Sequence, residues 1–120
     1  MNDRYCVFVY GTLMRGERAH GFLKGAGFIG EYRLKDYAMY RLGWYPGIRP
    51  SAGDCVYGEV YEVDSDMLRN MDEYEGEGSL YHRIRVPAEN ENGRIDVFVY
   101  VYAKETLGEK IAGGKWSEKE

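Results

Sequence analysis

The chain has 120 residues, of which 44% are hydrophobic and 30% are charged, values typical of one soluble globular domain. Its formal net charge of −4 argues against a surface built to bind nucleic acid or an anionic membrane, because such surfaces are basic. No stretch approaches the roughly 18 consecutive apolar residues of a membrane-spanning helix. Tyr occurs 12 times and is common in strands and at the rims of small-ligand pockets.

The first predicted element is a short apolar strand over residues 5–10, which stops abruptly at Gly11-Thr12-Leu13. A Gly at this point allows a tight turn that presents main-chain N–H groups to a ligand, although an ordinary turn would also use Gly. Residues 17–24, closed by Gly25, are predicted to form a short helix or turn.

The next stretch is predicted to be a hairpin followed by a loop. Residues 28–34 and 37–42 have the composition of two strands, separated by a turn at Lys35-Asp36. Residues 43–50 contain two Gly and two Pro, which are typical of irregular structure. Trp44 and Tyr45 in this loop would form either a pocket wall or part of a packed surface loop.

A strand over residues 55–63 leads into the one long helix that the pattern predicts. Asp64-Ser65-Asp66 offers an N-cap and acidic residues at the positive end of the helix. Apolar residues spaced along one face indicate core packing, and Gly76 ends the helix. Strands are then predicted over residues 81–86 and 94–102, around a turn at 90–93.

The strand over residues 94–102 has apolar or aromatic side chains on both faces, which is typical of a central strand. One helix among many strands predicts an α+β fold, a small mixed β-barrel with one or two short helices packed outside. A ferredoxin-like sandwich fits less well, because it needs two crossover helices of similar length. We expect a single domain over residues 1–120, with residues 104–120 as a tail on its surface.

The cysteines and histidines give no sign of a metal site, because Cys6, Cys55, His20 and His82 lack metal-binding spacing. Both cysteines fit the pattern of small buried apolar residues. We therefore expect neither a metal nor another cofactor. No signal-peptide core follows Met1, which favours a cytoplasmic location. The oligomeric state stays open.

Four acidic residues cluster where the helix is predicted to end: Asp72, Glu73, Glu75 and Glu77. Negative charge is unfavourable at a helix C-terminus, so this cluster is either a solvated acidic turn or part of a functional site. A carboxyl group directed into an apolar, Tyr-lined pocket would have a raised pKa, suited to a general base near neutral pH.

The turn and the acidic cluster together resemble the gamma-glutamylcyclotransferase-like family. The matching segments are Val9-Tyr10-Gly11-Thr12-Leu13 with Gly16, Asp72-x-x-Glu75-Gly76, Tyr81-x-Arg83 and Val101-Tyr102. The resemblance extends from Val7 to about Trp116 and is strongest to the short, compact branch that includes gamma-glutamylamine cyclotransferase. One departure from the family pattern is Met71, where Leu usually precedes the Asp.

The resemblance implies that the protein cyclises the γ-glutamyl group of a small γ-glutamyl amine or amide to 5-oxoproline and releases the amine. Glu75 would be the catalytic general acid/base. The substrate-binding residues would be Tyr10, Gly11, Thr12, Leu13 and Tyr81. The main-chain amides of the turn would hold the α-carboxylate or a carbonyl oxygen of the substrate.

Several alternatives remain at this stage. Glu73 and Glu77 compete with Glu75 for the role of base, and Arg83 either binds a carboxylate or forms a structural ion pair. Tyr102 would line the pocket or belong to the core. The protein could instead be a non-catalytic small-molecule binding protein with the same pocket. A nucleic-acid-binding barrel is disfavoured by the net charge of −4.

Overall fold

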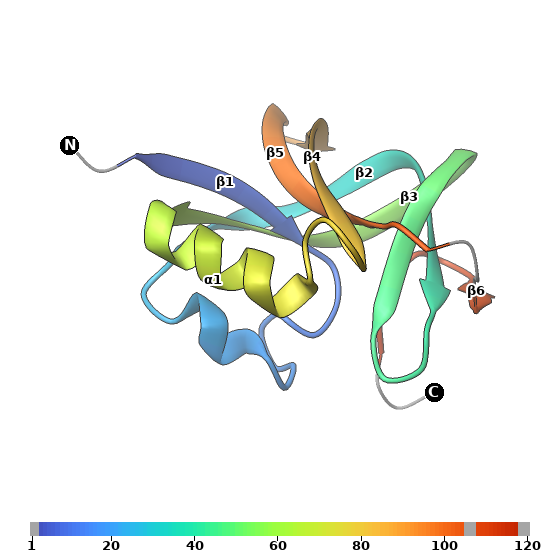
Figure 1. The fold of residues 1–120 in the computed structure, drawn as a ribbon. Coiled ribbons are helices and arrows are strands. Elements are labelled where there is room, and N and C mark those ends of the chain that lie inside the picture. Colours follow the sequence, from blue (N-terminus) through green and yellow to red (C-terminus); the bar gives the residue numbers. More distant parts are fainter. Residues whose placement is uncertain (1–2, 105–107, 118–120) are drawn as a thin grey trace.

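A computed structural model of the chain describes residues 3–104 and 108–117. Its strands form one mixed sheet in the order β3-β1-β5-β4-β2-β6 (Figure 1). The strands are β1 (Arg4–Val9), β2 (Gly27–Arg41), β3 (Pro46–Asp64), β4 (Tyr81–Asn90), β5 (Gly93–Tyr102) and β6 (Glu109–Ile111). A further pairing between β3 and β2 closes the sheet into a ring. The helices are α1 (Ser65–Glu75) and the short 3₁₀-helix η1 (His20–Leu23), so the predicted α+β class is confirmed.

Both faces of the sheet are buried in its middle. Strand β5 lies between β1, which is parallel to it, and β4, which is antiparallel. Val97 and Val99 of β5 belong to one apolar cluster, whereas Tyr100 belongs to a second cluster with Leu68 and Met71 of α1. Figure 1 shows α1 outside the sheet, with the segment that contains η1 beside it. The prediction of a central, two-sided strand at residues 94–102 is therefore confirmed.

The hairpin predicted at Lys35-Asp36 is wrong, because β2 runs through these residues as one long strand. The pairing of β2 with β3 shifts register between Lys35 and Tyr37. Asp36 lies at this irregularity with a φ of 67° and accepts a hydrogen bond from the Gly53 amide at 3.0 Å. Asp tolerates the left-handed conformation, and a β-bulge uses that property as a turn does.

The loop predicted at residues 43–50 is shorter than expected, because β3 already begins at Pro46. Pro46 and Pro50 pair with Arg41 and Tyr37 of β2. The other neighbour of β3 in the sheet, β1, pairs only with β3 residues 59–64. Proline is tolerated at the first position of a strand and where one side of the strand has no partner, since its missing N–H costs no sheet hydrogen bond there.

Helix α1 forms where its sequence predicts it. The side chain of Asp64 accepts a hydrogen bond from the Met67 amide at 2.8 Å, and this N-cap satisfies one of the unpaired N–H groups of the first turn. Gly76 ends the helix with a φ of 65°, a conformation that suits a residue without a Cβ. The Glu77 amide then donates to the Asp72 carbonyl at 3.0 Å. This turn leaves Glu75 as the last residue of the helix.

Within the predicted surface tail, residues 108–117 contribute to the sheet and the core, whereas residues 105–107 and 118–120 lie outside the described residues. Strand β6 pairs with β2, and the Tyr57 amide of β3 donates to the Gly114 carbonyl at 2.9 Å. Trp116 is only 6% exposed and belongs to the apolar cluster that holds Val97 and Val99. Most residues of the predicted tail are polar, so its sequence suggested a surface position. One large side chain, that of Trp116, anchors it in the core.

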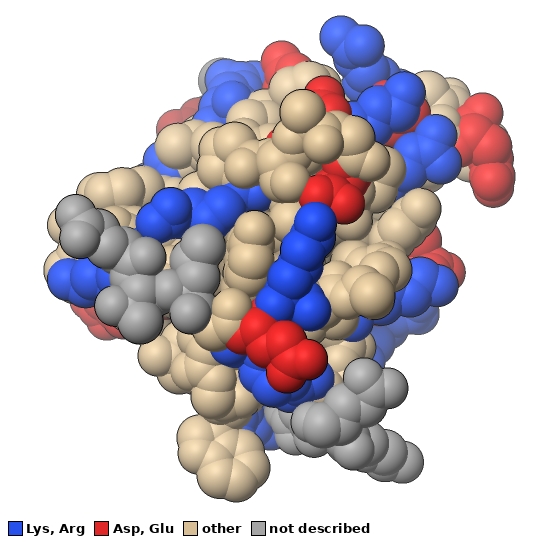
Figure 2. Space-filling model, turned by 90° about the vertical axis from the view of Figure 1, so that its right-hand side faces the viewer, with Lys and Arg blue, Asp and Glu red and all other residues tan. Residues whose placement is uncertain are grey.

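Charges of both signs are interleaved on the face shown in Figure 2, where basic and acidic side chains lie next to one another. Among the ion pairs are Lys110 with Asp54 at 2.8 Å and Arg33 with Glu89 at 2.9 Å. That nucleic acid is not a partner stays a prediction. Within the described residues, no helix has the length and apolar character needed to cross a membrane.

Candidate active site

A cavity of about 240 Å³ lies between the end of β1, the C-terminal end of α1 and the first residues of β3 and β4. This volume is small beside the roughly 300–1,000 Å³ of pockets for drug-sized ligands, so the cavity suits a small molecule. Its lining residues are Phe8, Val9, Tyr10, Gly11, Thr12, Leu13, Arg18, Tyr45, Pro46, Tyr74, Glu75, Leu80, Tyr81 and Tyr100. The six residues predicted for catalysis or substrate binding all line this one cavity.

The turn at residues 10–13 forms one wall. Gly11 is required there for close approach, since a Cβ at this position would lie 2.4 Å from Cγ of Pro46. Its φ is not positive, so the glycine serves this close approach and not an unusual backbone angle. The Met14 amide donates to the Gly11 carbonyl at 3.0 Å, and the Ala19 amide donates to the Thr12 carbonyl at 2.9 Å. These two hydrogen bonds hold the turn in place.

The main-chain N–H groups of this turn are available to a ligand. Gly11, Thr12 and Leu13 are buried, yet no acceptor within residues 3–104 and 108–117 receives a hydrogen bond from their amides. The Thr12 hydroxyl lies 2.9 Å from the Tyr74 hydroxyl, which fixes its side chain against α1. Consecutive amides of this kind are suited to bind an anion or a carbonyl oxygen.

Glu75 provides the carboxyl group of the cavity. Burial raises its pKa from an ordinary value of 4.5 to about 7, because an ionised carboxylate loses hydration in this apolar site. Among the residues that the structure describes, none donates a hydrogen bond to this carboxylate. A carboxyl group that is half ionised near neutral pH is suited to accept a proton and to return it.

Three buried tyrosines surround Glu75, and their hydroxyls are bonded within the protein. The Tyr10 hydroxyl donates to the Tyr100 carbonyl at 2.6 Å, and the Tyr81 hydroxyl donates to the Pro46 carbonyl at 2.6 Å. Burial is the largest cause that raises the pKa of each of these tyrosines, and the charge of Glu75 adds to it. They therefore stay protonated and form apolar walls.

The other acidic and basic candidates lie outside the cavity. Glu73 and Glu77 are exposed, and the Glu77 carboxylate accepts a hydrogen bond from the Arg83 amide at 3.3 Å. The Arg83 side chain forms an ion pair with Asp72, with its Nε at 2.8 Å from Oδ1. Of the two alternatives for Arg83, the structure shows the structural ion pair.

The aromatic candidates divide between the cavity and other places. Tyr45 lines the cavity, whereas Trp44 is 79% exposed. Tyr102 lies outside the lining, packs on the ring of Tyr81 at 5.8 Å and accepts a hydrogen bond from Arg49 at its carbonyl. Tyr100 lines the cavity but was not among the predicted site residues. The alternation along residues 94–102 indicated only on which face of the strand Tyr100 lies.

Metal-binding side chains are not gathered in this part of the fold. Within residues 3–104 and 108–117, no group of three His, Cys, Asp or Glu side chains is placed to hold a metal ion. The groups on the cavity lining that can bind or move charge are the Glu75 carboxyl, the Arg18 guanidinium and the main-chain amides of residues 11–13, set among tyrosine side chains.

The sequence profile of the family described as gamma-glutamyl cyclotransferase, AIG2-like, matches residues 7–118. The chain belongs to this family. The family protein YtfP of Escherichia coli K12 is 32% identical over 117 residues, which are 95% of this chain and 97% of that protein. The gamma-glutamylaminecyclotransferase of Bos taurus is 39% identical over 109 residues, which are 81% of this chain and 65% of that protein.

The fold agrees with this family. The crystal structure of an AIG2-like protein from Mus musculus superposes with a TM-score of 0.83 at 29% identity, covering 98% of this chain and 90% of that one. The resemblance inferred from the Tyr10–Leu13 turn and the Asp72-x-x-Glu75-Gly76 motif is therefore confirmed, and with it the assignment to a gamma-glutamylcyclotransferase type of enzyme.

Proposed function

We propose that this gamma-glutamylcyclotransferase family member cyclises the γ-glutamyl group of a small γ-glutamyl amine or amide to 5-oxoproline and releases the amine. The observation that carries the proposal is the position of Glu75, whose carboxyl group has a pKa of about 7 and lines the same cavity as the amides of residues 11–13. The relative from Bos taurus is named for activity on γ-glutamyl amines, which supports this substrate class.

The reaction needs no nucleophile from the protein. The α-amino nitrogen of the substrate attacks its own γ-carbonyl carbon, so that one C–N bond forms in a five-membered ring while the amide C–N bond to the leaving amine breaks. Glu75 takes a proton from the α-ammonium or attacking amine and gives one to the departing nitrogen. Substrate and products contain the same atoms, so neither water nor a cofactor is consumed.

The turn at residues 10–13 supplies binding and orientation. Its main-chain amides would hold the α-carboxylate or a carbonyl oxygen, which fixes the glutamyl group against the tyrosine walls. A substrate held folded in this way loses little further entropy on ring closure, and such positioning supplies a large part of the barrier reduction. This turn binds the substrate, and Glu75 moves the proton.

A second candidate is a non-catalytic protein that binds 5-oxoproline or a γ-glutamyl compound in the same cavity. It shares the buried amides of residues 11–13, which are equally suited to a binding protein. Product formation separates the two functions, because binding alone would release no 5-oxoproline.

The test is 5-oxoproline release by the purified protein from a panel of γ-glutamyl amines and γ-glutamyl amino acids. We expect kcat/KM to fall about tenfold for each pH unit below 7, since the proton acceptor is then the minor, ionised form of Glu75. Above pH 7 this carboxyl group no longer limits the rate. Binding of 5-oxoproline without turnover of any member of the panel would favour the binding protein.

A further inference from the structure

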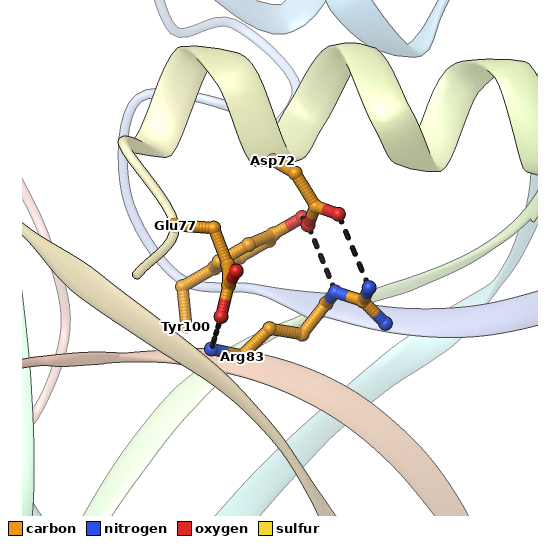
Figure 3. Close-up of polar contacts among 4 residues, drawn as sticks. All are labelled: Asp72, Glu77, Arg83 and Tyr100. Carbon is orange, nitrogen blue, oxygen red and sulfur yellow. Dashed lines mark hydrogen bonds and ion pairs between the residues drawn. The ribbon is translucent and has the colours of Figure 1, made fainter. Parts of the chain in front are cut away.

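Asp72 connects α1 to two strands of the sheet (Figure 3). Its Oδ1 accepts hydrogen bonds from Nε of Arg83 at 2.8 Å and from the Tyr100 hydroxyl at 2.7 Å. Its Oδ2 accepts a third from Nη2 of Arg83 at 3.1 Å. Arg83 belongs to β4 and Tyr100 to β5, so this carboxylate joins the end of the helix to both strands.

The geometry of these contacts is well defined. Arg83 and Tyr100 lie opposite each other in the antiparallel pairing of β4 with β5, so their side chains share one face of the sheet. The Arg83 and Asp72 side chains are 25% and 24% exposed, and the two parallel N–H···O bonds form the bidentate arrangement that gives such pairs their strength. The guanidinium also lies 4.8 Å from the centre of the Phe98 ring.

The same network ends at the cavity. Asp72 precedes Glu75 by three residues, and residues at this spacing lie on one side of a helix. Tyr100 connects Asp72 to the cavity, because its hydroxyl donates to Asp72 and its side chain lines the cavity together with Glu75. The end of α1 that carries Glu75 is thus anchored to β4 and β5 by its neighbour one turn earlier.

We infer that Asp72 and Arg83 act as a positioning pair, which fixes Glu75 in the cavity and keeps the charge beside it balanced. The inference rests on the role proposed for Glu75. The pair carries one negative and one positive charge, so it places almost no net charge near the carboxyl group. Removing only one member would leave an uncompensated charge on that side of the cavity.

The other groups that face Glu75 do not provide this balance. A tyrosine comes from each element around the cavity: Tyr10 after β1, Tyr45 before β3, Tyr74 on α1, Tyr81 on β4 and Tyr100 on β5. Burial raises the pKa of the three most buried of them, Tyr10, Tyr81 and Tyr100, so these three add no charge beside Glu75. Arg18 lies on the lining from the loop before η1, where it is exposed to solvent and donates to the Trp44 carbonyl at 2.7 Å. Water screens its charge more than it screens the partly buried pair.

The test compares the acid limb of the pH profile of kcat/KM in single and double variants. Asp72→Asn leaves the positive Arg83, which favours ionised Glu75, so the midpoint should move down by roughly half a pH unit or more. Arg83→Gln leaves the negative Asp72, which disfavours ionised Glu75, so the midpoint should move up by a similar amount. The double variant should return to the midpoint of the unmodified protein.

Two further variants separate position from charge. Arg83→Lys keeps the charge but loses the bidentate contact, so it should keep the midpoint and lower kcat by about tenfold. Glu73→Gln removes an exposed negative charge from the residue next to Asp72 on α1, and it should change neither the midpoint nor kcat. Shifts of the two single variants in the same direction, or no shift in either, would overturn the inference.

A carbon-13 NMR titration of the Glu75 carboxyl group in the same variants provides a readout that needs no activity. Opposite shifts of the Glu75 titration in Asp72→Asn and Arg83→Gln support the pair, whatever the rates show. A rate that does not follow the ionisation of Glu75 would count against the proposed function and not against the pair. An unchanged Glu75 titration in folded Asp72→Asn and Arg83→Gln protein, together with an unchanged kcat in Arg83→Lys, would overturn the pair while leaving Glu75 as the base.

Discussion

Replacing Glu75 by Gln should lower kcat for 5-oxoproline release by about a thousandfold, which is within the range that general acid/base catalysis contributes. Gln has nearly the size of Glu but cannot accept and return a proton. The substitution leaves the cavity and the main-chain amides of residues 11–13 in place. Binding of 5-oxoproline, measured by calorimetry, should therefore stay within a few fold of the value for the unmodified protein.

Glu73→Gln is the matched control for this experiment, because Glu73 lies two residues earlier on α1 and is exposed. Its activity should stay within about twofold of the unmodified protein. A Glu75→Gln protein that still turns over at the normal rate would remove Glu75 from the mechanism. Loss of product binding together with activity would instead make Glu75 a binding residue.

Replacing Trp116 by Ala should lower the free energy of unfolding by about 3 kcal/mol or more, the usual cost of removing a buried large aromatic side chain. Trp116 is 6% exposed and packs in the cluster that holds Phe8 and Ile48. The guanidinium of Arg41 also lies 4.5 Å from the centre of its ring. Urea unfolding measures the change directly.

Trp44→Ala is the control, since Trp44 is 79% exposed and its removal should cost less than about 0.5 kcal/mol. If Trp116→Ala proved as mild as Trp44→Ala, the stretch after residue 108 would not belong to the core. The pair of variants thus compares one residue type in two surroundings that the sequence alone does not distinguish.

Local patterns predicted the elements that depend on local chemistry. The N-cap chemistry at residues 64–66, the apolar stripe of α1 and the end of the helix at Gly76 all act within a few residues, and each appears in the structure. The alternation in residues 94–102 identified the central strand because both of its faces are apolar.

The errors occurred where a distant partner decides the structure. Asp36 is equally suited to a turn and to a bulge, and the pairing of β2 with β3 selects the bulge. Pro46 and Pro50 argue against a strand that is paired on both sides. They are tolerated in this part of β3 because it pairs with β2, whereas β1 pairs with residues 59–64. Trp116 is buried against strands that lie far from it in the chain.

The candidate site shows the same division. Its turn and Glu75 were predicted from motifs about sixty residues apart, and the structure brings both to one cavity. A structural ion pair at Arg83 was one of two open alternatives, but its partner Asp72 and the bond of Asp72 to Tyr100 were not predicted, since they depend on the register between β4 and β5. No spacing in the sequence indicates that a helix end lies over that pair of strands.

Carbon-13 NMR titration of the Glu75 carboxyl group, with and without 5-oxoproline, tests the central claim most directly. We expect a pKa near 7 in the free protein, because burial disfavours the ionised form, and a changed titration when the product occupies the cavity. An ordinary pKa near 4.5 that does not respond to 5-oxoproline would contradict Glu75 as the proton-transfer group of the cavity.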